Sequence, residues 1–214
     1  MESSGIKTMT VGDVELAYET FGDPSATPVL LVSGLGSQMI SYADELCAGL
    51  AARGLFVIRF DNRDVGLSTH LHDAGLPRLG DVRRGDRSSV HYELADMAAD
   101  TAGLVDALGL GSVHLVGVSM GGMIAQTLAI HHAERVLTLT SIMSTTGKRT
   151  VGWQNPRVIP ALLASAGRTR RAKAWAGAQR TPGAAGCLSV ARLIANSGSY
   201  GTIRLCPQVS VLCV

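Results

Sequence analysis

The sequence contains no acidic residue beyond Glu134 and no histidine beyond His132, although the chain has 214 residues. Residues 1–134 carry 17 acidic and 8 basic side chains, whereas residues 135–214 carry 11 basic ones. Globular surfaces usually mix both signs of charge, and a stretch of eighty residues without a carboxylate is therefore unusual. Chemistry that needs a carboxylate or an imidazole must therefore draw it from the first 134 residues.

Other shortages exclude whole classes of protein. Aromatic residues make up 4% of the chain, and no aromatic pattern accompanies the basic run at residues 168–173, so no nucleic-acid partner is expected. The four cysteines include no C-x-x-C pair, and no metal site is predicted. Charged residues make up 17% and the mean hydropathy is +0.24, which excludes intrinsic disorder.

Neither the start of the chain nor its longest uncharged stretch predicts export or membrane insertion. Residues 1–14 have neither the basic nor the apolar region of a signal peptide. Residues 107–133 are long enough to span a bilayer, but they contain five glycines together with serine, histidine and glutamine. We therefore expect a cytoplasmic protein without a membrane span and with reduced thiols.

Apolar runs typical of strands alternate with helical patterns in the first part of the chain. Strands are predicted at residues 6–11, 14–21, 28–32, 55–60, 113–118 and 136–143, and helices at 42–53, 92–108 and 120–132. This alternation predicts an α/β fold, with a mostly parallel sheet, right-handed crossovers and helices on both faces. Along the helix at 92–108, Asp100 is expected to point away from the apolar face.

Residues 117–121, Gly-Val-Ser-Met-Gly, form a G-x-S-x-G motif between a predicted strand and a predicted helix. In this setting the serine stands on a tight strand-to-helix turn. Gly117 and Gly121 lack the Cβ atoms that would obstruct so sharp a turn. The free N–H groups at the start of the following helix favour a developing oxyanion. Ser119 is therefore the predicted nucleophile.

A second glycine-containing loop, Ser-Gly-Leu-Gly at residues 33–36, follows the earlier strand at 28–32. An oxyanion hole needs two backbone donors, one from the residue after the nucleophile and one from such a loop. The backbone N–H groups of Met120 and Leu35 are therefore the predicted donors.

Three segments together resemble the α/β-hydrolase superfamily: residues 33–36, residues 60–68 (Phe-Asp-Asn-Arg-Asp-Val-Gly-Leu-Ser) and residues 117–123. The most similar branch is the esterase/lipase group that includes aclacinomycin methylesterase-like and LipG-like enzymes. The resemblance covers about residues 8–145, and its motifs occur in the family's order. It implies the α/β-hydrolase fold and the hydrolysis of small-molecule carboxylic esters through an acyl-enzyme on Ser119, without a cofactor.

Within the second of these segments, Asp61 and Arg63 are interpreted as residues that fix the loop. Many members of the family carry histidine where this chain has Ser33. The resemblance also implies three parts of the chain. Residues 1–145 form the hydrolase core, residues 146–180 begin a helical cap, and residues 181–214 are an atypical tail.

The larger departure from the family concerns the catalytic acid and histidine. The family places both after the nucleophile, but this chain has neither residue type after Glu134, so both remain unknown. His131 lies roughly 18 Å from Ser119 along the predicted helix, and His114 roughly 16 Å along the predicted strand, too far for either to serve. His70 follows the strand at 55–60 and lies at the correct edge of the sheet, which makes it the candidate base.

Two other interpretations stay open. In the first interpretation, the chain is a catalytically impaired hydrolase remnant or pseudoenzyme. The sequence after Arg180 favours it, because it lacks acidic residues, is enriched in cysteine and resembles out-of-frame translation. The second is a dinucleotide-binding oxidoreductase, because a strand, Gly34-Leu35-Gly36, a helix, a strand and Asp61 occur in that order. Met39, however, stands where the third glycine of that motif belongs.

The tail and the substrate are the least determined features. No strand is predicted in residues 181–214, so the sheet is expected to end at the strand 136–143 with an open edge. Open edges promote association, and self-association is therefore expected. The acyl and alcohol groups of the substrate follow from no motif in the chain.

Overall fold

A computed structural model of the protein describes residues 3–71, 81, 84 and 86–146, together with the backbone of residues 202–206 and 209–213. The strands are β1 (Lys7–Val11), β2 (Val14–Phe21), β3 (Thr27–Val32), β4 (Leu55–Phe60), β5 (Val113–Val118), β6 (Val136–Ile142), β7 (Thr202–Cys206) and β8 (Val209–Cys213). The helices are α1 (Asp44–Ala51), α3 (Leu94–Ala107) and α4 (Met120–His131), with short 3₁₀ turns at Met39–Ser41 and Ala133–Arg135.

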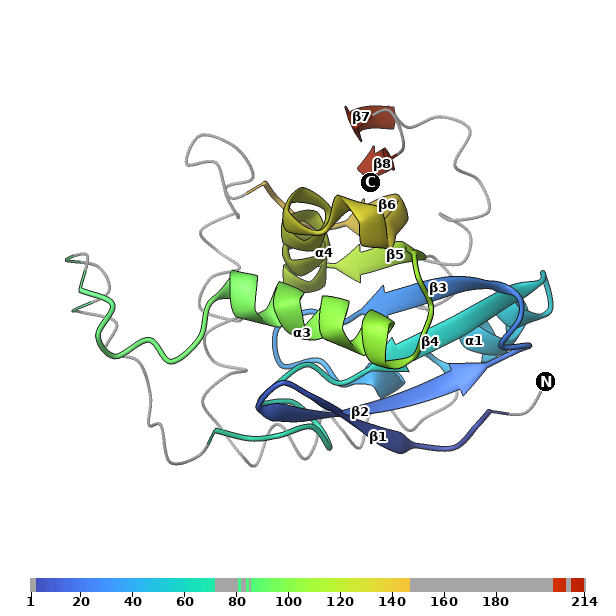
Figure 1. Cartoon of the computed structure of the whole chain (residues 1–214), viewed down its shortest axis with the longest axis horizontal. Helices are drawn as coiled ribbons and strands as arrows, with labels where there is room; N and C mark the ends of the chain where they lie inside the picture. Colours follow the sequence, from blue (N-terminus) through green and yellow to red (C-terminus); the bar gives the residue numbers. More distant parts are fainter. Residues whose placement is uncertain are drawn as a thin grey trace.

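These strands form one sheet in the order β1-β2-β4-β3-β5-β6-β8-β7 (Figure 1). The central run from β4 to β8 is parallel, whereas β1, β2 and β7 pair antiparallel with their neighbours. The predicted α/β-hydrolase fold with a mostly parallel sheet is confirmed. Because β3, β4, β5 and β6 point the same way, their carboxyl ends meet at one edge, where ligands bind in open α/β sheets.

Alternation along the buried strands divides the interior into two cores. On β3, Leu30 and Val32 pack into the core that includes residues of α3 and α4, whereas Val29 and Leu31 pack into the core that includes residues of α1. Successive side chains of a strand point to opposite faces, so the two cores lie on opposite faces of the sheet. The expectation of helices on both faces is confirmed. The edge formed by the carboxyl ends of the parallel strands therefore has a packed core on each face of the sheet.

The carboxyl-terminal strands differ from the expectation. β7 and β8 lie in the tail, where no strand is predicted from the sequence. β8 runs parallel to β6, with Leu139 opposite Val211, so the expectation of an open edge at β6 is wrong. β7 and β8 have five residues each and lie in a stretch without persistent periodicity, so the sequence offers no side-chain pattern by which to recognise them. Self-association stays a prediction, and the predicted cap lies outside the described residues from residue 147 onward.

The uncharged stretch at residues 107–133 folds as β5, a tight turn and α4. Its glycines fall largely in the connections and at the turn, which explains why its length does not produce one long helix. Among the residues that the structure describes, no helix is long and apolar enough to cross a membrane.

Candidate functional site

Ser119 occupies the turn between β5 and α4 with φ 56° and ψ −121°. A positive φ is uncommon for a residue with a side chain and costs on the order of 1–3 kcal/mol. The turn is held because the Ser119 N–H donates to Ile142 O at 2.8 Å and the Ser119 carbonyl accepts from Gly122 N at 3.0 Å. Ser119 is exposed, so the strained turn presents it at the carboxyl edge of the sheet.

The two glycines of the motif lie where a side chain would collide with backbone. A Cβ on Gly117 would lie 2.3 Å from Gly121 O, and one on Gly121 would lie 2.1 Å from Val32 O. Neither obstacle is the flexible end of a side chain, so a larger residue at either position would have to shift the backbone. The sharp turn and its contact with the end of β3 therefore depend on glycine at both positions.

The loop at residues 33–36 packs directly against the nucleophile turn. A Cβ on Gly34 would lie 3.3 Å from Ser119 Cβ and 3.9 Å from Ser119 Oγ. Within the described part of the chain, neither the Leu35 N–H nor the Met120 N–H has a hydrogen-bond acceptor. Two backbone N–H groups, one on each side of this contact, therefore have no acceptor among the described residues, and an oxyanion site needs two such donors.

Buried polar contacts fix the start of this loop. The Asn62 side chain, 2% exposed, donates from Nδ2 to the Ser33 carbonyl at 3.1 Å. The Tyr42 hydroxyl donates to the Val32 carbonyl at 2.8 Å. Ser33 Oγ is buried and has no hydrogen-bond partner among the described residues. Asn62 therefore holds the peptide immediately before Gly34-Leu35, a role that the sequence analysis did not identify.

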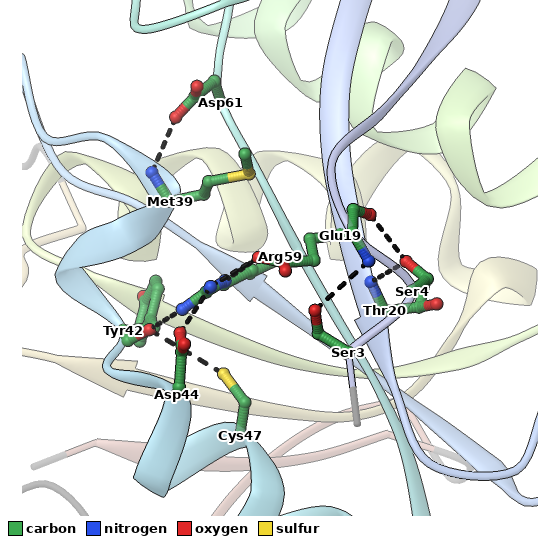
Figure 2. A network of polar contacts seen from close by, with 11 residues as sticks. Ser3, Ser4, Glu19, Thr20, Met39, Tyr42, Asp44, Cys47, Arg59 and Asp61 are labelled. Atoms are coloured by element: carbon green, nitrogen blue, oxygen red, sulfur yellow. Dashed lines mark hydrogen bonds and ion pairs between the residues drawn. The ribbon is translucent and has the colours of Figure 1, made fainter. Parts of the chain in front are cut away.

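The buried Asp61 carboxylate joins two further loops of this edge. Its Oδ1 accepts from Met39 N at 2.6 Å, and its Oδ2 accepts from Leu67 N at 3.0 Å; the contact with Met39 is visible in Figure 2. Burial raises the pKa of Asp61, although both N–H donors oppose that shift. A Cβ on Gly66 would lie 2.0 Å from Asp61 Oδ2, so glycine is needed there too. The loop-fixing interpretation of Asp61 is confirmed.

Figure 2 also shows how Arg59 anchors the segment that leads into α1. The Arg59 guanidinium contacts Glu19, the Tyr42 carbonyl and Asp44 Oδ1, the last at 2.6 Å. It also lies over the Phe21 ring, 4.9 Å from its centroid. The Tyr42 hydroxyl in turn binds the Val32 carbonyl at the end of β3, immediately before the 33–36 loop. Arg59 therefore supports the start of that loop indirectly, through Tyr42.

Arg63 ties the loop after β4 to helix α3. Its Nε and Nη2 donate to the two Asp100 carboxylate oxygens, each at 2.6 Å, and the two side chains are 8% and 9% exposed. The loop-fixing interpretation of Arg63 is confirmed. Asp100, predicted to lie off the apolar face of this helix, is nevertheless buried, because a buried guanidinium needs an ionised partner. Helical periodicity groups residues by hydrophobicity and cannot reveal a partner 37 positions away.

The structure separates the candidate histidines. His114 lies on β5 with Nδ1 2.7 Å from Thr138 Oγ1 of β6, as part of the sheet. His70 is exposed and places Nε2 3.1 Å from the Gly66 carbonyl, in the loop that Asp61 organises. Its electrostatic interaction with Asp61 lowers the pKa of that carboxyl, against the larger effect of burial. His70 thus lies in a loop at the carboxyl end of β4, on the expected edge.

Burial lowers the pKa of His114 below its ordinary value. The unfolded chain therefore takes up this proton first, and the free energy of unfolding falls as the pH drops from about 6.5 toward the folded pKa. We expect His114→Asn, which keeps a polar group near Thr138, to lose less stability than the wild type between about pH 7.5 and about pH 5. Urea denaturation measures both slopes, with the exposed His91→Asn as control. Equal slopes for His114→Asn and the wild type would contradict the prediction.

Comparison with known proteins concerns the family and the fold. The model of the alpha/beta hydrolase fold family matches residues 27–182, more than half of the chain. Two rhodomycin D methylesterases are similar to this chain over 137 residues: DauP of Streptomyces sp. (strain C5) is 36% identical to it, and DnrP of Streptomyces peucetius is 35% identical. In each case the match covers 64% of this chain and 41% of the relative, so the chain spans well under half the length of these relatives.

Solved structures show the same fold. A hydrolase from Pseudomonas aeruginosa superposes with a TM-score of 0.59 at 23% identity, over 81% of this chain and 57% of that one. The 2-hydroxy-6-oxo-6-phenylhexa-2,4-dienoate hydrolase of Rhodococcus sp. strain RHA1 gives a TM-score of 0.60 at 21% identity, over 76% and 53%. At these identities the similarity concerns the fold alone.

Proposed function

Because the chain belongs to the α/β-hydrolase fold family, we propose that it is built as a serine hydrolase of carboxylic esters. Ester chemistry is favoured because two relatives at about 35% identity are methylesterases. The observation that carries the proposal is the contact between the 33–36 loop and Ser119, with the N–H groups of Leu35 and Met120 lacking an acceptor among the described residues. The proposed substrate is a small-molecule ester.

In the proposed reaction, Ser119 Oγ attacks the carbonyl carbon of the ester. The carbonyl oxygen becomes an oxyanion that accepts hydrogen bonds from the N–H groups of Leu35 and Met120. Collapse of this intermediate breaks the bond to the alcohol, which leaves with the proton from the serine, and the acyl group stays on Ser119. Water then attacks the acyl-enzyme, releasing the carboxylic acid and restoring the hydroxyl. No cofactor enters these steps.

The proton transfer sets the efficiency of this reaction. A serine at its ordinary pKa is a weak nucleophile and needs a histidine that is held by an acid. The sequence has neither residue type after Glu134. This observation supports the second candidate function, a hydrolase remnant that binds and polarises esters without an activated serine. Membership of the hydrolase family argues against the dinucleotide-binding alternative, because the same glycine loop would serve as the oxyanion loop.

Replacing Asn62 tests the proposed oxyanion loop. Asn62→Asp keeps the size of the side chain but turns the donor facing the Ser33 carbonyl into an acceptor. Losing one oxyanion donor outright costs about 10²–10³ in kcat, so displacing the loop should lower kcat for p-nitrophenyl acetate about tenfold or more. KM should change little, since the interaction strengthens in the transition state.

Gln126→Glu is the matched control for this change. Gln126 donates to Ser141 Oγ at 2.9 Å and belongs to α4, so the same amide-to-carboxylate change leaves the 33–36 loop alone. Circular dichroism at the assay temperature confirms that each variant is folded. A folded Asn62→Asp protein with wild-type kcat would refute the assigned oxyanion loop. Hydrolysis no faster than in buffer for every protein would refute the ester hydrolase proposal itself.

A further inference from the structure

Large exposed hydrophobic side chains gather at the edge that holds Ser119. Six such residues occur in the described chain, and four of them lie in loops at the carboxyl ends of β3, β4 and β6: Leu35, Ile40, Leu67 and Met143. Single exposed hydrophobic residues scattered over a surface are ordinary, but a group around one site indicates binding of an apolar partner. The position of these four residues therefore suggests that they contact an apolar part of a ligand bound near Ser119.

Two of these residues flank Ser119 on its two neighbouring strands. Leu35, 74% exposed, follows Gly34, whose Cβ position lies 3.3 Å from Ser119 Cβ. Met143, 72% exposed, follows Ile142, whose carbonyl accepts the Ser119 N–H at 2.8 Å. Since β5 lies between β3 and β6 in the sheet, the serine stands between one apolar residue on each side.

The backbone at Met143 strengthens this observation. Met143 has φ 48°, a left-handed conformation that glycine or asparagine would adopt at lower cost. A methionine held there with its side chain exposed contributes little to the core. A methionine side chain is flexible and adapts its shape to apolar ligands, so at this position it is better suited to contacting a ligand than to stabilising the turn.

The other two residues extend the apolar surface along the same edge. The Asp61 carboxylate binds the N–H of Leu67 and the N–H of Met39, the residue before Ile40. One buried carboxylate thus joins the loops that carry Leu67 and Ile40. The surface is a built feature of the edge, since its loops are held by buried contacts.

We infer that the site selects esters whose acyl group is an apolar chain of several carbons, and that Met143 is a specificity-determining residue for that chain. This inference rests on the proposed function. The acyl group is the part of the ester that stays bound to Ser119 after the alcohol leaves, so it occupies the surroundings of the serine through both steps. Each methylene that leaves water on binding gains up to a factor of about four in affinity.

The test compares p-nitrophenyl hexanoate with p-nitrophenyl acetate, each rate divided by its spontaneous rate. We expect kcat/KM to favour the hexanoate by roughly tenfold, less than full burial of four methylenes would give. Met143→Gln, similar in length but polar, should reduce this preference about fourfold, mainly through KM. Met143→Leu, which restores an apolar side chain, should recover most of it.

Ile130→Gln is the matched control, because Ile130 is 69% exposed near the opposite end of α4. It should leave the preference unchanged. Hydrolysis of both esters without a preference, or the same effect from Ile130→Gln, would overturn the inference while leaving the ester hydrolase proposal intact. A preference that follows the alcohol chain, measured with hexyl and ethyl acetate, would overturn the acyl assignment. Absence of any hydrolysis above buffer would overturn both proposals.

A binding measurement gives a readout that does not depend on turnover. With the methionine methyl groups labelled with ¹³C, the Met143 resonance is assigned by its loss in Met143→Gln. We expect 2-octanone, an ester analogue that cannot be hydrolysed, to shift this resonance at lower concentration than acetone does. Equal responses to the two ketones, or a shift confined to other methionines, would contradict the role of Met143.

Discussion

Under the remnant interpretation, Ser119→Ala in the 214-residue chain should leave the rate of p-nitrophenyl acetate hydrolysis nearly unchanged. In a well-studied serine hydrolase, loss of the serine or the histidine alone costs roughly 10⁶ in turnover, about as much as loss of the whole triad. The remaining acceleration, about 10³ to 10⁴ over water, comes from binding and the oxyanion hole. A chain with neither an acid nor a histidine after Glu134 should already work near that residual level.

The comparison of wild type and Ser119→Ala decides between the two candidate functions. A drop of about a hundredfold or more would contradict the remnant interpretation and require a base within this sequence. His70 would then be the first residue to replace, because it lies in a loop on the same edge. A form of the protein that supplies both missing residues should be faster by several orders of magnitude and fully dependent on Ser119.

Asp100→Ala should destabilise the protein by about 3–5 kcal/mol, because it leaves the buried Arg63 guanidinium with only the exposed Asp13 carboxylate, at 3.9 Å, as a counter-charge. Both oxygens of Asp100 are bound at 2.6 Å, and both side chains are at least nine-tenths buried. Urea denaturation monitored by circular dichroism measures the loss as a lower midpoint at unchanged slope. The affected loop also contains Asp61 and Asn62, so the lost pair is one of the contacts that support the site.

Asp106→Ala provides the control for this prediction. Asp106 pairs with Arg135 at 2.7 Å, but these side chains are 52% and 34% exposed, so the expected cost is about 0–1 kcal/mol. The double variant Arg63→Met/Asp100→Leu replaces the buried pair by apolar groups and should recover much of the lost stability. Equal costs for Asp100→Ala and Asp106→Ala would show that burial does not govern the pair.

The sequence by itself determined the α/β fold and the order of its central elements. Largely apolar runs such as residues 113–118 and 28–32 correspond to strands β5 and β3 because a strand covered on both faces must be mostly apolar. It also indicated the Ser119 turn, since only glycine fits at Gly117 and Gly121. Both signals depend on residues that are close together in the chain, so they can be recognised in the sequence without knowledge of the tertiary structure.

The tertiary structure alone decided the contacts that support the site. Asn62 reaches Ser33 across 29 positions, and Arg63 reaches Asp100 across 37, so no periodicity in the chain connects them. The pairing of β8 with β6 uses backbone groups that every residue carries. The apolar surroundings of Ser119 likewise arise only because parallel strands bring loops distant in sequence to one edge of the sheet.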